Sequence, residues 1–357
     1  MRLVVSKSDE FFITIAKHEY HSFILAGVRK RNGQIHSLTK VGKRLNFHED
    51  NCFGLLKAGL YRASALLWDE GVHRRSGSNI PISYTSYSIT YEQYLDLVFL
   101  LEKAQQEFRC TFDCYKPISA TDENVVLEYT FDWKLIPNLG LPISNQEKNE
   151  TEVVGERPVV QQTLHRTHVL AASNTCRHTA IDLIHYVTGV KESTQNLSSQ
   201  FFRDLPLKTS LVADQGEEFM FKGEAYRSLR PDPNKYFYIL PKPPTAFKEL
   251  DGFKRKVLTD LYSRMERMLS IAPNSKETQE KFELLKTLYN QHISDNSESI
   301  DQFLTSLQQW KNEHQKEIGK LRKTFFFDHL FQRQSATAKL FQQWLQEGAK
   351  HLTSFNH

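Results

Sequence analysis

The feature that most constrains the fold is a proline cluster, Pro241-Lys242-Pro243-Pro244, at which the hydrophobic period changes. Before it, extended apolar runs alternate with turns and short helical patterns. Beyond it, apolar residues recur at the 3.6-residue spacing of amphipathic helices. Proline cannot donate to a sheet ladder or continue a helix, so the cluster favours a domain boundary. We predict an α+β fold, with a mixed α/β N-terminal region followed by a C-terminal antiparallel helical bundle.

A second change in composition divides the N-terminal region. Residues 144–158 are polar and nearly free of large apolar side chains, which is typical of an exposed loop or linker. A chain of 357 residues has the length of about two domains. The predicted organisation is an N-terminal α+β domain over 1–143, the linker over 144–158, a second α+β segment over 159–242 and the bundle over 245–357.

Hydrophobic periodicity, turn residues and caps predict the individual elements. The predicted strands are 11–16, 22–29, 35–41, 84–89, 109–115, 124–133, 159–172 and 236–240, with a hairpin turn at Asn32-Gly33. One helix is predicted over 55–67. A second begins at a capping box formed by Thr90 and Gln93, and a third is predicted over 175–188 with Gly189 as its C-cap. Beyond the prolines, apolar stripes predict four helices, over 253–268, 282–292, 303–321 and 340–352.

Charge and composition exclude several functions. The formal net charge of +4 is too small and too diffuse to indicate nucleic-acid binding. No run of about 18 apolar residues is present, so we expect a soluble chain without a transmembrane helix. Residues 1–8 lack the apolar core of a signal peptide. The basic and then aromatic segment 316–327 fits an anionic membrane surface, although a cationic helix end followed by core aromatics is the favoured interpretation.

The sequence predicts no cofactor and no metal. Cys110 and Cys114 have no second ligand pair at the spacing of a zinc site, and we expect free thiols. His165 and His168 are three residues apart on the predicted strand, so they would face opposite sides of it and could not share a metal ion. Phosphate-binding glycine loops and the common hydrolase signatures are also missing from the sequence.

Cys176 is the candidate for chemistry. It lies in the predicted first turn of a helix, near the positive end of the helix dipole, where a thiol pKa falls. Arg177 and His178 add positive charge nearby. The alternative is an inert, packed thiol, because Cys176 is in register with Ala180, Leu183 and Val187 on the apolar face, and this alternative is favoured.

The candidate bases for Cys176 are His178, His168 and His165. His178 lies two residues away on the same helix and points in a different direction. His165 and His168 precede the cysteine, so either could act only in a permuted chain order. No histidine lies between His185 and His292, where a papain-like arrangement would place its base.

Several segments resemble secreted effectors of one class. These are 88–94 (SITYEQY), 114–117 (CYKP), 174–180 (NTCRHTA) and 237–244 (FYILPKPP). Across about 80–245 they resemble type IV (Dot/Icm) effectors of Legionella-type intracellular bacteria, and the tail over 352–357 resembles a type IV secretion signal. Some such effectors are papain-like cysteine hydrolases, whose Asn-Cys-Arg core matches Asn174, Cys176 and Arg177 here.

The resemblance implies secretion into the host cell cytoplasm by a type IV system and action on host proteins or membranes. The favoured function is therefore a translocated effector that binds a host protein, through the outer face of the bundle or the loops over 190–235. The alternative is a papain-like cysteine hydrolase or transferase that uses Cys176.

Overall fold

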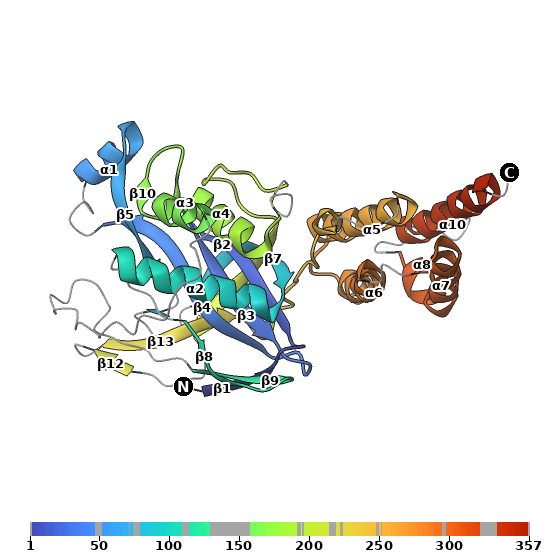
Figure 1. Ribbon diagram of the computed structural model, residues 1–357, viewed down its shortest axis with the longest axis horizontal. Coiled ribbons are helices and arrows are strands. Elements are labelled where there is room, and N and C mark those ends of the chain that lie inside the picture. Colours follow the sequence, from blue (N-terminus) through green and yellow to red (C-terminus); the bar gives the residue numbers. More distant parts are fainter. Residues whose placement is uncertain are drawn as a thin grey trace. The chain divides into compact units, whose positions relative to one another are not determined.

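The computed structural model divides the chain into two compact units, Met1–Ile239 and Leu240–His357 (Figure 1). It describes residues 2–46, 52–70, 72–73, 79–108, 114–128, 158–190, 194, 196–213, 219–221, 224–247, 250, 252–294, 298–321 and 334–355. The division lies beside the proline cluster at which the hydrophobic period changes. Helices and strands are both abundant, which confirms the α+β class.

The first unit is built on a long sheet with the strand order β10-β5-β4-β3-β2-β7-β11-β13-β12, in which β6 also pairs with β13. Its strands are β2 (Glu10–His18), β3 (His21–Arg29), β4 (Ile35–Leu45), β5 (Ala63–Asp69), β6 (Val72–His73), β7 (Ile80–Ile89), β10 (Val169–Leu170), β11 (Leu207–Ala213), β12 (Phe219–Phe221) and β13 (Glu224–Pro231). Because β10 pairs with β5 and β11 with β7, the ranges 1–143 and 159–242 contribute to one sheet.

Helices and a small sheet complete this unit. The small sheet has the order β1-β9-β8, from β1 (Arg2–Ser6), β8 (Lys116–Ala120) and β9 (Asn124–Glu128). The helices are α1 (Cys52–Leu60), α2 (Tyr91–Phe108), α3 (Pro158–Thr167) and α4 (Cys176–Thr188). Helices α2 and α4 lie over one face of the long sheet, and α4 contacts β2, β3 and β4 (Figure 1). The start of α4 is thereby held against the centre of the sheet.

Strands β2 and β3 are buried along almost their whole length, because both faces of the sheet are covered. Consecutive residues of a strand point to opposite faces. Phe11 accordingly packs against Tyr94 of α2, with ring centroids 5.7 Å apart, whereas Phe12 packs against Phe237 at 5.4 Å. Phe237 also stacks on Tyr84 of β7 at 4.6 Å. The core of this unit therefore lies on both sides of its central strands.

The ladder between β3 and β4 contains one irregularity. Phe23 pairs with Gly42 and Ala26 with Thr39, but Gly27 then pairs with Ser37, so Leu38 is one extra residue on β4. Leu38 is buried. An extra residue of this kind is a β-bulge, which changes which residues face each other beyond it.

Three predicted elements are wrong. The helix predicted over 55–67 ends at Leu60 and is followed by β5, because pairing with β4 outweighs the helical preference of the Ala and Leu residues there. The strand predicted over 159–172 is mainly α3, which begins at Pro158 and buries Val160 and Leu164 at helical spacing. Residues 236–239, predicted as a strand, are mostly buried but have no regular secondary structure.

Other local predictions are confirmed. The hairpin turn at Asn32-Gly33 is present, and Gly33 has the positive φ of 83° that such a turn requires. Thr90 and Gln93 form the reciprocal capping bonds, at 3.0 and 3.2 Å, that open α2. The predictions for 109–113 with Cys110, for the linker over 144–157, for 322–327 and for the last two residues lie outside the described residues.

The second unit consists of helices throughout its described regular elements. They are the short 3-10 turn Pro244–Ala246, α5 (Gly252–Ile271), α6 (Lys276–Ile293), α7 (Ile300–Glu313), α8 (Gln315–Gly319) and α10 (Ala336–Phe355). The stripe predicted over 303–321 is divided at His314, which ends α7 and precedes α8. Trp310 of α7 stacks on Phe341 of α10 at 5.2 Å, and the Trp344 indole donates to Asp260 of α5 at 3.1 Å.

A buried charge cluster joins α5, α6 and the start of α7. Lys254 Nζ donates to Glu298 Oε2 at 2.9 Å, and His292 Nδ1 lies 2.9 Å from the same oxygen. Removing one member of a buried pair leaves an uncompensated charge, so Glu298→Ala should lower the free energy of unfolding by about 3–5 kcal/mol. The exposed Glu280, paired with Lys320 at 2.9 Å, is the matched control. Thermal unfolding of the full chain measures both, and equal small effects would contradict the expectation.

Among the described helices, none combines the length and the apolar character that a bilayer crossing requires.

Candidate active site

Cys176 is the first residue of α4, as the sequence predicts. Thr175 is the N-cap, with φ −75° and ψ 177°, and Gly189 ends the helix in the left-handed conformation at φ 69°. Ala180, Leu183 and Val187 are buried, which confirms the apolar face of the helix. Cys176 itself is only partly buried, so its thiol is not sealed within the core.

The imidazole of His21 lies beside the thiol of Cys176, near enough for each group to shift the pKa of the other. His21 begins β3, directly after the tight turn of the β2–β3 hairpin, in which Glu19 has a φ of 49°. The backbone N–H of the next residue, Ser22, also donates to Cys176 Sγ, at 3.4 Å. The hairpin therefore supplies both a side-chain and a backbone contact to the sulfur.

Glu70 fixes the other side of the imidazole. Its Oε1 lies 2.8 Å from His21 Nε2, which leaves Nδ1 as the ring nitrogen free for the thiol. Arg44 donates to both carboxylate oxygens, from Nε and Nη2, each at 2.8 Å. The backbone N–H of Glu70 donates to Lys40 O at 3.0 Å. The carboxylate is thus held by β4 while it orients His21.

The contact between His21 and Glu70 crosses β4 at a glycine. His21 belongs to β3 and Glu70 follows β5, and β4 lies between these two strands. A Cβ atom on Gly42 would lie 2.6 Å from His21 Nε2 and 2.7 Å from Glu70 Oε1. Because Gly42 has no side chain, there is room at this position for the imidazole and the carboxylate to meet.

The electrostatics of the cluster favour a thiolate paired with an imidazolium. Burial opposes charge on Cys176, but the hydrogen bond and positive charge of His21, the Ser22 N–H and the nearby charge of Lys43 together lower the pKa of the thiol. Burial likewise opposes charge on His21, yet its bonds to Cys176 and Glu70 raise the imidazole pKa to about 9. The pKa of Glu70 is lowered, because His21 and Arg44 outweigh its burial.

The structure places the three predicted histidines elsewhere. His178 closes back on the N-cap, where its Nδ1 accepts from the Thr175 N–H at 3.3 Å. His165 is exposed on α3, which is a helix and not the predicted strand. His168 lies at the end of α3, and its carbonyl accepts from the Ala65 N–H at 2.8 Å. None of these hydrogen bonds involves Cys176.

Sequence reasoning missed His21, Glu70 and Arg44. A signal was available, because the predicted strands 11–16 and 22–29 imply a hairpin turn, and His21 lies at its end. A search for a base in any chain order would have included this residue. Glu70 carries no such signal, since only the pairing of β5 with β4 brings it near.

The described residues contain no group of three or more His, Cys, Asp or Glu side chains suited to a metal ion. Cys52, Cys114 and Cys176 are free thiols, of which Cys52 is exposed and Cys114 buried. The arrangement around Cys176 brings together a thiol, an imidazole and a carboxylate. This is the residue pattern of nucleophilic catalysis.

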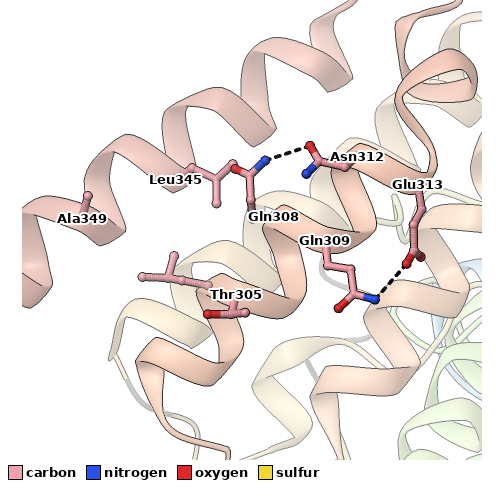
Figure 2. Close-up of a pocket in the computed structure, with 8 residues that line it drawn as sticks. Thr305, Gln308, Gln309, Asn312, Glu313, Leu345 and Ala349 are labelled. Carbon is pink, nitrogen blue, oxygen red and sulfur yellow. Dashed lines mark hydrogen bonds between the residues drawn. The ribbon is translucent and has the colours of Figure 1, made fainter.

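A separate surface groove lies on the second unit, between α7 and α10. Figure 2 shows Leu345 and Ala349 of α10 facing Thr305 and Gln308 of α7. The polar residues at its rim bond to one another, Gln308 to Asn312 and Gln309 to Glu313, at 2.9 and 2.8 Å. Apolar side chains of both helices line the groove, and amide groups lie at its rim.

No family model matches the chain, and comparisons with curated proteins and with solved structures likewise found no match. A function is therefore inferred from the geometry around Cys176.

Proposed function

We propose that the first unit is a cysteine-dependent acyl hydrolase or acyl transferase. The observation that supports this most is the convergence of Cys176, His21 and Glu70 from three distant segments of the chain. A nucleophile beside a base that a third group orients is the general signature of an activated thiol. Cys176 is only partly buried, and it lies at a helix N-terminus that favours the thiolate.

The residues have distinct roles in the proposed reaction. The Cys176 thiolate attacks an acyl carbonyl, and a carbon–sulfur bond replaces the bond to the leaving group. The His21 imidazolium gives its proton to that leaving group. Water, or an acceptor nucleophile in a transferase, then attacks the thioester while neutral His21 takes its proton, and the thiolate returns. Glu70 holds the imidazole and stabilises its charged form, and the backbone N–H groups at the start of α4 adjoin the developing oxyanion.

The reaction should show a bell-shaped dependence on pH. The nucleophile is the thiolate, so the rate rises as pH increases through the lowered pKa of Cys176. The leaving group needs a proton from imidazolium, so the rate falls as pH passes about 9, the pKa of His21. Rates of acylation by an alkyl ester, whose alkoxide leaving group must be protonated, measured from pH 4 to 11, test this profile.

Alkylation by iodoacetamide tests the thiol itself. Peptide mass spectrometry of the folded chain follows Cys176 separately from the exposed Cys52, which serves as an internal reference. We expect Cys176 to react with a midpoint well below the ordinary thiol pKa of about 8.5. A Cys176 that stays unreactive below about pH 8 in folded protein would exclude the proposed function.

We further propose, from the sequence resemblance, that the chain is a type IV effector that enters the host cell and binds a host protein. In this proposal α5, α6, α7 and α10 form an antiparallel bundle, and the groove of Figure 2 is the contact surface. A translocation reporter fused to the chain, in bacteria with and without a functional type IV system, tests entry. Equal reporter signal from both strains would contradict it.

A further inference from the structure

Lys43 of β4 is almost fully buried, at 2% exposure, and its ammonium group lies among backbone oxygens of one short segment. Nζ donates to Val169 O at 2.8 Å, to Asn174 O at 2.7 Å and to Asn174 Oδ1 at 3.0 Å. Arg166 O lies 3.3 Å away. These oxygens all belong to the last turn of α3 and to the segment that leads from it to α4.

Asn174 closes the same cluster from its other side. Its Nδ2 donates to Arg166 O and to Val169 O, both at 2.8 Å. Its backbone N–H donates to Ala171 O at 2.9 Å, which closes a tight turn. Lys43 and Asn174 therefore bind the same two carbonyls, and together they fix the segment that leads into α4. We call these two residues the Lys43–Asn174 clamp.

The clamp is two residues from the nucleophile. Thr175 follows Asn174 as the N-cap, and Cys176 begins the helix. A shift of the segment over 166–174 would therefore move the sulfur relative to His21, which is held independently by the hairpin and by Glu70. Small displacements of a reacting group can reduce a rate about 100-fold.

The charge of Lys43 adds to this effect. Burial lowers the Lys43 pKa to about 7, while negative charge on Cys176 and on Asp182 favours the ammonium and Arg166 opposes it. In return, Lys43 is among the groups that lower the pKa of Cys176. The oxygens around Nζ accept hydrogen bonds, and only the ammonium form of lysine has three N–H donors to give them.

We propose that Lys43 is the positioning residue of the Cys176 site: it locks the segment over 166–174 onto β4 and so sets where α4 presents the thiol to His21. This inference rests on the proposed function, because it assigns a role within the same site. Lys43 itself contacts neither the sulfur nor a substrate in this role. Its effect is transmitted through Asn174 and through its charge.

Lys43→Met tests the proposal, because methionine has similar length but no charge and no N–H donor. The measurement is the pH profile of Cys176 alkylation by iodoacetamide in the full chain, with thermal unfolding as the check on folding. We expect the midpoint of the profile to rise by about 1 pH unit, the lower end of the effect of a nearby opposite charge. Lys17→Met is the matched control, since Lys17 is a buried lysine of the same sheet that donates to Asp204 instead, at 2.8 Å.

A second variant, Asn174→Ala, keeps the ammonium and removes the amide half of the clamp, so it serves where Lys43→Met does not fold. It should also raise the midpoint, by loosening the contact between Cys176 and His21. Folded variants whose profiles match that of the unmodified chain would overturn the inference. An unmodified chain without a lowered midpoint would instead reject the proposed function, so the two failures are distinguishable.

Discussion

Replacing His21 with alanine should slow acylation of Cys176 by an activated ester about 10²–10⁴-fold, the usual contribution of a positioned acid or base. The imidazole lies beside the thiol and is the main group that lowers the thiol pKa against the effect of burial, so its charge stabilises the thiolate. Without it, burial of Cys176 should raise the thiol pKa, and the thiolate fraction at neutral pH should fall. The measurements are the acylation rate and the pH midpoint of iodoacetamide alkylation.

His18→Ala is the matched control for this variant. His18 pairs with His21 across the same hairpin, but its Nδ1 contacts Pro81 O at 2.9 Å, away from the sulfur. It should leave the acylation rate within a factor of a few of the original. Similar losses from both variants would indicate damage to the hairpin, and a folded His21→Ala protein with unchanged rate would remove the base from the proposed mechanism.

Gly42→Ala should be almost as damaging, although it adds a single methyl group. The new Cβ would lie 2.6 Å from His21 Nε2 and 2.7 Å from Glu70 Oε1, closer than real Cβ atoms approach their neighbours. Imidazole and carboxylate would have to separate, and the imidazole would lose its orientation and part of its raised pKa. We expect an acylation rate lower by about 100-fold, the scale of a displacement near 1 Å.

Gly59→Ala provides the comparison, because no atom lies within 4 Å of a Cβ added there. Gly59 is within α1, where alanine should stabilise the helix by about 0.5–1 kcal/mol. Acylation rates and unfolding midpoints of the two variants separate loss of chemistry from loss of fold. A Gly42→Ala protein with full activity would show that His21 and Glu70 act without their contact.

Local chemistry made much of this site predictable. The N-cap before Cys176, the apolar face of Ala180, Leu183 and Val187, and Gly189 at the helix end depend on residues close in sequence, and all were found. The strand over 22–29 was predicted as well, so the position of His21 at a hairpin end was within reach.

The rest of the site depends on pairings between distant residues, which single-sequence patterns do not specify. Ser22 and Cys176 are 154 positions apart, and nothing near either residue indicates the contact. Glu70 reaches His21 only because β5 pairs with β4, in a region where the apolar spacing predicted a helix. The favoured prediction of a packed, inert thiol followed from the helix alone. The hairpin that changes the thiol's surroundings lies outside that helix.

The bulge at Leu38 has a consequence for how this site tolerates change. Were the β3–β4 ladder regular from its Ile35–Arg29 end, Phe23 would face Val41 in place of Gly42. A valine side chain would then occupy the gap through which base and carboxylate touch. A one-residue insertion in β4 between Ile35 and Val41, with the single bulge retained, would therefore bring Val41 opposite Phe23 and disable the chemistry while every reactive group stayed in the chain. The spacing along this strand constrains the site as strongly as the identity of its side chains.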